Sequence, residues 1–132
     1  MNEETANPSP QPKIARARPF TEGHLSGGTG QWLLSGPDTG EGFALHRGTL
    51  APGAGPPLHV HSREDETFYI LAGEVEVTIS DQRDTLRGGD CVFLPRGIPH
   101  RLQNLSGGSG VKRVGAGARP YRFRGARRFW PL

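Results

Sequence analysis

Two histidines separated by one residue, His59 and His61, stand in the stretch GAGPPLHVHSREDETFYILAG between Gly53 and Gly73. In a β-strand, residues i and i+2 point to the same side, so both imidazoles can reach one point. Glu66 follows five residues after His61, across the polar residues SRED. A turn there would bring its carboxylate to the same side. Two imidazoles and a carboxylate are a usual donor set for a divalent transition metal.

A single His-x-His pair, taken alone, is more often incidental than a metal site. Two other carboxylates, Glu64 and Asp65, lie near the pair, and we interpret them as solvated turn acids because the spacing favours Glu66. A second stretch, GDCVFLPRGIPHRLQN, strengthens the metal interpretation. It predicts a strand that ends at Pro95, a reversing turn over the residues PRG, and a new strand that begins with His100.

Together the two stretches resemble the two motifs of the cupin family at every fixed position. Gly53 to Gly73 fits the pattern G(X)5HXH(X)3-4E(X)6G, and Gly89 to Asn104 fits G(X)5PXG(X)2H(X)3N. The resemblance implies an all-β fold, a double-stranded β-helix or jelly-roll cupin barrel, of the kind found in small single-domain bacterial cupins. It also implies that four side chains bind one metal ion inside the barrel: His59, His61, Glu66 and His100.

This implied donor set is typical of a catalytic metal site. Three neutral imidazoles and one carboxylate leave one or two positions of an octahedral metal open for water, O2 or substrate. The cofactor we expect is one divalent transition metal ion, and Fe, Mn, Ni, Co, Cu and Zn all fit these donors. The sequence does not choose among them.

The rest of the sequence favours the same fold class. A chain of 132 residues suits one domain, and its 20 glycines and 12 prolines separate short β-branched or aromatic stretches. The residues EVEVTIS alternate apolar and polar side chains, as in a strand with one face in the core. We interpret SDQRD as the turn that follows. The strands we expect are Gln31–Ser35, Gly42–Leu50, Leu58–His61, Thr67–Gly73, Glu74–Ser80, Cys91–Pro95 and His100–Asn104.

Three segments are expected along the chain. Residues 1–18 are proline-rich and poor in apolar groups, which predicts a disordered N-terminal arm. Residues 19–105 form the predicted cupin barrel. Residues 106–132 form a basic tail rich in Gly and Arg, whose order the sequence does not establish; Val111–Val114 is only a poor strand candidate.

Strand parity predicts which side chains point into the barrel. Counted from Glu66 and from His100, the inward side chains are Phe68, Ile70, Leu102 and Asn104, with Phe93 as a weaker candidate. They would either line a pocket around the metal or form ordinary core. Cys91 has no CxxC partner, so we expect a buried structural thiol. His24 and His46 lack a second donor at ligand spacing, so we expect surface or strand histidines rather than ligands.

Charge and composition set expectations about partners and location. The net charge is +3, but from Cys91 onward the chain has nine basic residues and no acidic one, so the excess is local. We expect a solvated or partner-contacting tail and no nucleic-acid partner. A single cysteine, no standard secretory signal and no apolar run long enough for a bilayer predict a cytoplasmic protein without a membrane partner. We also expect a homodimer.

The function we expect is that of a metal-dependent oxidoreductase, a dioxygenase that acts on a phenolic or enolic small molecule with O2. The segment from TGQWLLSGPDTG through the first motif resembles small cupins described as quercetinase-like. Glu66 would serve as a ligand and, when detached, as the catalytic base. Two alternatives stay open. One is a non-redox polyketide cyclase, isomerase or decarboxylase, and the other is a cupin that binds a small molecule without catalysis.

Overall fold

The computed structural model of the chain describes residues 9–19, 21–25, 28–105 and 111–118. This part folds almost entirely into β-strands, with one short 3-10 helix, η1 (Pro37–Thr39). The strands are β1 (Thr21–Leu25), β2 (Gly28–Leu34), β3 (Ala44–Leu50), β4 (Asp65–Ala72), β5 (Glu74–Ile79), β6 (Gln82–Arg87), β7 (Cys91–Leu94), β8 (His100–Gln103) and β9 (Val111–Ala118).

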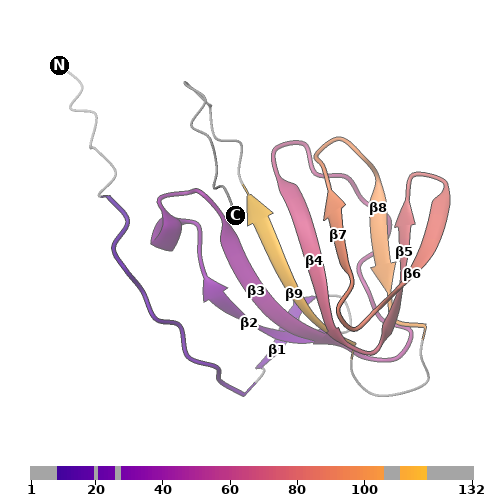
Figure 1. Cartoon of the computed structure of the whole chain (residues 1–132), viewed down its shortest axis with the longest axis horizontal. Coiled ribbons are helices and arrows are strands. Elements are labelled where there is room, and N and C mark those ends of the chain that lie inside the picture. Colours follow the sequence, from indigo (N-terminus) through magenta and orange to yellow (C-terminus); the bar gives the residue numbers. More distant parts are fainter. Residues whose placement is uncertain (1–8, 20, 26–27, 106–110, 119–132) are drawn as a thin grey trace.

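The strands form two sheets that enclose the core. The larger sheet has the order β1-β2-β3-β9-β4-β7, and the smaller one has the order β6-β5-β8. All pairings are antiparallel. Figure 1 shows the larger sheet curving from β1 to β7, with the smaller sheet beside β7. The predicted all-β jelly-roll fold is confirmed.

The core lies between the inner faces of the two sheets. Strand β5 shows how the alternating sequence contributes to this core: the apolar residues Val75 and Val77 are buried, whereas Glu74 is exposed. Removing a large apolar side chain of this kind from water stabilises the fold by about 1.5–3 kcal/mol. The inward positions predicted for Phe68, Ile70, Leu102 and Asn104 are confirmed. The buried apolar side chains are Leu50, Phe68, Ile70, Val75, Val77, Leu94 and Leu102.

Two predictions of burial on β7 were wrong. Phe93 is 61% exposed, and Cys91 is also exposed. The register explains both, because Leu94 pairs with Glu66 and shares its inward face, while Phe93 pairs with Thr67 on the outer face. Cys91 lies two residues before Phe93 and therefore points outward as well.

Several predicted elements differ from the structure, and β1 was not predicted. The segment Leu58–His61 is not a strand, because only His59 pairs, in an isolated bridge with His100. The predicted turn SDQRD is tighter than expected, since β6 already begins at Gln82. Strand β6 was not predicted because its residues are polar and mostly exposed, and therefore show no apolar alternation.

Strand β9 lies in the segment that the sequence assigned to the tail. It pairs with β3 on one side and with β4 on the other, so it occupies the middle of the larger sheet. Figure 1 shows it between these two strands. Its residues VKRVGAGA carry no strand pattern because Gly and Ala provide neither polar nor bulky side chains to alternate. The sheet therefore extends beyond residue 105; the other predicted domain boundaries stay predictions.

Residues 9–19 have no regular secondary structure but contact the barrel. The side chain of Gln31 on β2 accepts a hydrogen bond from the backbone N–H of Arg18 and donates one to the carbonyl of Arg16. Lys13 forms an ion pair with Asp38 at 2.6 Å. Asp38 also accepts hydrogen bonds from the backbone N–H and the hydroxyl of Ser35, so it joins the arm to the start of η1.

We expect the Lys13–Asp38 contact to be visible in a titration. The hydrogen bond from Lys13, followed by those from Ser35, lowers the pKa of Asp38 from its usual 3.8 to about 2. Because the folded pKa lies below the unfolded one, the stability that Asp38 contributes is present above about pH 4 and is lost as the pH falls towards 2. Side-chain carboxyl shifts measured by NMR should show this pKa, and the change Lys13→Met should raise it. A pKa of Asp38 that is identical in both proteins would contradict the contact.

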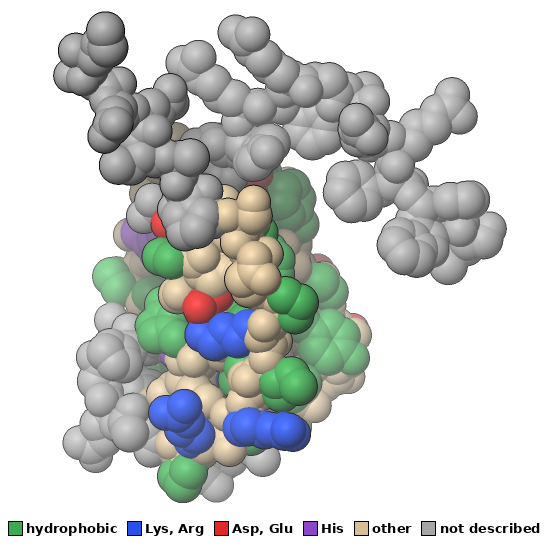
Figure 2. Space-filling model, turned by 90° about the vertical axis from the view of Figure 1, so that its left-hand side faces the viewer, with side chains coloured by type: hydrophobic (Ala, Val, Ile, Leu, Met, Phe, Trp, Pro, Cys, Tyr) green, Lys and Arg blue, Asp and Glu red, His purple; other side chains and the backbone are tan. Residues whose placement is uncertain are grey.

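The surface of the described part carries a mixture of charged, neutral and hydrophobic side chains. Figure 2 shows Lys and Arg side chains interspersed with hydrophobic and neutral ones on the side that it displays. None of the helices in the described ranges has the length and apolar character needed to cross a membrane.

Candidate metal centre

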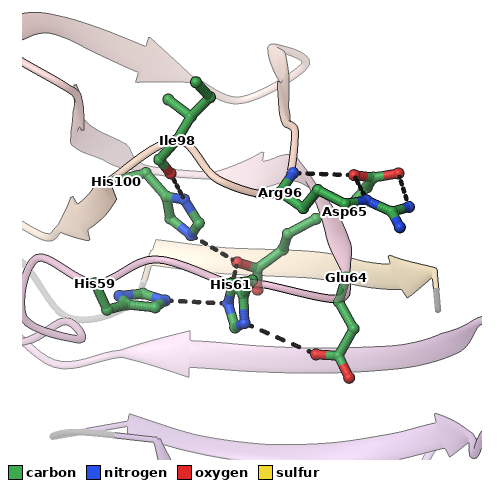
Figure 3. Close-up of polar contacts among 8 residues, drawn as sticks. His59, His61, Glu64, Asp65, Arg96, Ile98 and His100 are labelled. Atoms are coloured by element: carbon green, nitrogen blue, oxygen red, sulfur yellow. Dashed lines mark hydrogen bonds and ion pairs between the residues drawn. The ribbon is translucent and has the colours of Figure 1, made fainter. Parts of the chain in front are cut away.

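Four donor side chains meet at one point inside the barrel. His59 and His61 come from the loop before β4, Glu66 is the second residue of β4, and His100 is the first residue of β8. One donor atom from each of the four lies within 4.8 Å of all the others. Figure 3 shows the three imidazole rings turned towards one another.

The shortest contacts in the cluster join nitrogen and carboxylate atoms. His100 Nε2 lies 3.0 Å from Glu66 Oε2, and His61 Nε2 lies 3.4 Å from the same oxygen. The two atoms His59 Nε2 and His61 Nε2 are 3.2 Å apart. The Nε2 atoms of all three rings therefore face the centre of the cluster.

Backbone hydrogen bonds hold the ligand-bearing segments together. The N–H of His59 donates to the carbonyl of His100 at 3.0 Å, and the N–H of His100 donates back at 2.8 Å. The N–H of Gly97, in the turn before β8, donates to the carbonyl of His61 at 2.7 Å. Gly97 has a φ of 79°, a conformation that glycine adopts at little cost. The turn over PRG thus connects both sequence motifs.

The tautomers of His59 and His100 follow from their outer contacts. His59 Nδ1 lies 2.7 Å from the carbonyl oxygen of Pro57, and His100 Nδ1 lies 3.0 Å from that of Ile98. A carbonyl oxygen can only accept, so each Nδ1 carries the proton. In a neutral ring this leaves a lone pair on Nε2, directed at the cluster. His61 Nδ1 lies 3.7 Å from Glu64 Oε2, on the opposite side of the ring from its Nε2.

This arrangement fits a metal ion. Lone pairs on neighbouring Nε2 atoms and on the Glu66 carboxylate repel one another when nothing positive lies between them. A proton can bridge one such pair, whereas a cation at the centre satisfies all four donors at once. Imidazole nitrogen and carboxylate oxygen are donors that suit the divalent ions of Zn, Cu, Fe and Ni. The four residues can therefore hold a metal, and their types do not select which one.

The cluster is buried on one side and open on the other. The side chain of His100 is only 1% exposed, whereas those of His61 and Glu66 are 32% and 24% exposed. Glu66 Oε2 faces two imidazoles, and no hydrogen bond or ion pair joins Oε1 to any residue of the described ranges. The side of the cluster formed by His61 and Glu66 is therefore the one that faces solvent in the described part of the chain.

A second charged pair lies beside the cluster and was not predicted. Arg96 donates from Nε and Nη2 to the two carboxylate oxygens of Asp65, at 3.0 and 2.8 Å, and its backbone N–H donates to Oδ1 at 3.0 Å. These hydrogen bonds lower the pKa of Asp65 to about 2, and the same contact raises the pKa of Arg96. Asp65 immediately precedes Glu66, so the pair joins the start of β4 to the turn before His100 (Figure 3). Asp65 is thus not the simple solvated acid that we had predicted.

We expect the change Arg96→Lys to weaken metal binding by about tenfold, as typically happens when a residue that orients metal ligands is altered. Lysine keeps the charge but cannot reproduce the two parallel hydrogen bonds to Asp65. The affinity for Co(II), measured by competition with a chromogenic chelator, is the test.

The matched control for that change is Arg87→Lys. Arg87 pairs with Glu74 at 3.1 Å, and both side chains are more than half exposed and belong to β6 and β5. It should leave the Co(II) affinity unchanged. Equal effects of the two substitutions would show that the Asp65–Arg96 pair does not position the ligands.

The structure brings together all four residues of the predicted ligand set. Glu64 lies outside the cluster, on the far side of the His61 ring. Asn104, predicted to point inward, is buried and donates from Nδ2 to the carbonyl of Leu50. His46 is buried on β3 and is not part of the cluster, and the side chain of His24 lies outside the described residues.

A family model described as "Cupin domain" matches residues 46–111, which is half of the chain. This chain belongs to the cupin family. The matched range contains all four donor residues and ends at the first residue of β9.

The proteins to which this chain is similar have diverse names. Quercetin 2,3-dioxygenase of Bacillus subtilis is 34% identical over 74 residues, which are 56% of this chain and 22% of that protein. Xanthan biosynthesis protein XanB of Xanthomonas campestris is 34% identical over 67 residues, 51% of this chain and 14% of that protein. A solved structure described as a predicted oxalate decarboxylase of Thermotoga maritima has a TM-score of 0.73 and 25% identity, and covers 82% of this chain and 100% of that one. The chain thus spans less than a quarter of these two curated relatives.

Proposed function

We propose that this cupin is a metal-dependent enzyme, and that it is an oxygenase acting on a phenolic or enolic small molecule. The observation that supports it is the cluster itself: three Nε2 atoms and one carboxylate converge within 4.8 Å, with an open side towards solvent. On a five- or six-coordinate metal, four protein donors leave one or two positions for a substrate, and such an open position distinguishes a catalytic site from a closed structural one. The relative named quercetin 2,3-dioxygenase supports the oxygenase class.

The chain's own residues suggest how the site would work. A bound divalent metal would lower the pKa of a phenol or enol and, if it is redox-active, would allow electron transfer from the substrate to O2. His59, His61 and His100 would hold it through Nε2, and the carbonyls of Pro57 and Ile98 would orient the rings of His59 and His100. Glu66 would take the substrate proton on Oε1, the oxygen that faces neither imidazole. Phe68 and Leu94, which are buried on the same face of the sheet as Glu66, would exclude water from that exchange.

A non-redox function is the second candidate. The solved structure described as a predicted oxalate decarboxylase matches over its full length, so the same barrel also occurs under a name from decarboxylation chemistry. In that case a Lewis-acidic metal would polarise a carbonyl for decarboxylation, isomerisation or cyclisation, and O2 would not be needed. The same four residues would serve.

Metal analysis and oxygen uptake separate these candidates. Protein purified anaerobically would be analysed for bound metal, then loaded with Fe(II), Mn(II) or Ni(II) and mixed with a panel of flavonols and simpler phenols. We expect O2 uptake that is lost in His59→Ala. Turnover without O2 would instead indicate the non-redox class, and a protein that binds no metal on titration would be a small-molecule-binding cupin without catalysis.

Location and assembly are part of the proposal. We propose that the protein acts in the cytoplasm as a homodimer. Its single cysteine, Cys91, is exposed and has no second cysteine to pair with in the chain, which suits a reducing compartment. Light scattering during size-exclusion chromatography would measure the assembly state.

A further inference from the structure

Trp32 on β2 points to the inner side of the larger sheet. It pairs directly with His46 on β3, and directly paired residues of antiparallel strands lie on the same face. The two rings pack edge to face, with centroids 4.9 Å apart and an interplanar angle of 69°. Gly30 lies two residues before Trp32 and therefore on the same face of β2. A Cβ added at Gly30 would overlap the His46 ring, which confirms that this face is the one that His46 shares.

The same inner face carries the metal centre. His46 and Phe68 both pair with Gly115 of β9, while Ala44 and Glu66 both pair with its Gly117. Residues two apart on a strand share a face, so the side of the sheet that presents Glu66 also presents Phe68, His46 and Trp32. Across two strand spacings and two residues along the strand, the Cα positions of Glu66 and His46 are about 12 Å apart.

Trp32 is unusual on this face because it is exposed. Its neighbours His46 and Phe68 are 7% and 4% exposed, whereas Trp32 is 56% exposed. A tryptophan side chain is normally mostly buried, since its large apolar surface is costly to hydrate. The inner-face positions between Glu66 and His46 carry glycine on β9 and Ala44 on β3. At these positions no bulky side chain separates the metal centre from His46, the ring against which the indole packs.

We propose that Trp32 recognises the substrate by stacking, and that the substrate is a planar aromatic molecule of more than one ring. Its metal-binding oxygen atoms would lie at the cluster, and its distal ring would lie on the indole face, beside His46. Trp32 lies one strand spacing beyond His46, so its Cα is about 16 Å from that of Glu66, a span that the two side chains and a molecule of two or three linked rings can bridge. Stacking on an aromatic side chain would raise the affinity by up to about tenfold beyond the burial of the ring surface. This inference rests on the proposed metal centre and narrows the substrate class.

Two probes with the same chelating group separate stacking from metal binding. Maltol and 3-hydroxyflavone both present a 3-hydroxy-4-pyranone, but only 3-hydroxyflavone carries additional aromatic rings. Calorimetry would measure the affinity of both for the full chain loaded with redox-inert Zn(II). We expect Trp32→Ala to weaken 3-hydroxyflavone binding by about tenfold or more while the maltol affinity stays the same. Trp32→Phe, which keeps an aromatic face, should restore most of the loss.

Phe93→Ala is the matched control, because Phe93 is similarly exposed but lies on the outer face. It should change neither affinity. Equal loss for both probes in Trp32→Ala, or no loss for 3-hydroxyflavone, would overturn the role of Trp32 while leaving the metal centre in place. Failure of the unmodified protein to bind maltol would instead overturn the open metal centre on which the inference rests.

Discussion

Replacing Glu66 with glutamine should lower the affinity for Zn(II) or Co(II) by about a hundredfold or more. The change preserves the size of the side chain but removes the negative charge that faces His61 and His100 across 3.4 and 3.0 Å. A neutral amide oxygen is a weaker donor, and the amide nitrogen cannot act as a ligand at all. Competition with a chromogenic chelator measures the affinity, and the unchanged volume keeps the fold intact.

Glu64→Gln is the control for that experiment. Glu64 belongs to the same segment and lies 3.7 Å from His61 Nδ1, but its carboxylate is outside the cluster. Because the pair of Glu64 and His61 is partly exposed to solvent, the loss of the Glu64 charge should change the affinity by less than about tenfold. A larger effect of Glu64→Gln than of Glu66→Gln would show that the fourth ligand has been assigned to the wrong residue.

The change Gly55→Ala should destabilise the fold by about 3 kcal/mol or more. Gly55 has a φ of 153°, and a Cβ added there would overlap the carbonyl oxygen of Leu102 on β8. The backbone is held in this close approach because Gly53 N–H donates to the carbonyl of Asn104 and the Asn104 N–H donates to the carbonyl of Ala54. Urea denaturation of the metal-free protein gives the free energy of unfolding without a contribution from metal binding.

Gly53→Ala provides the comparison. Gly53 is the motif glycine, yet nothing lies within 4 Å of the Cβ that alanine would add, and only its φ of 72° is unfavourable. It should cost about 1–2 kcal/mol. If Gly53→Ala were the more destabilising of the two, the close contact between Gly55 and β8 would not exist in solution.

The ligand set could be predicted because its spacing is local within each motif. His59 and His61 lie two residues apart and Glu66 lies five further on, so their types and positions together form a recognisable pattern. His100 entered the prediction through the second motif. The structure shows the physical link between the two motifs, which is the pair of backbone hydrogen bonds between His59 and His100.

The features that were missed depend on contacts between distant parts of the chain. Asp65 and Arg96 are 31 residues apart, and nothing in either local sequence marks them as partners. The sequence does not distinguish Trp32 from other aromatic residues in strands, and only the strand register places it opposite His46. Phe93 was assigned to the wrong face, because a four-residue strand carries too little alternation to determine its register.

The central position of β9 determines when this barrel can be completed. A nascent chain that ends at residue 105 has β1 to β8, but in the larger sheet β3 and β4 contact each other only through β9. The two halves of that sheet would each present an unpaired edge until residues 111–118 leave the ribosome. Such long-range pairing is slow to form. The last of the described strands to be synthesised is therefore the one that joins the halves, so premature termination before it would yield an aggregation-prone fragment rather than a smaller barrel.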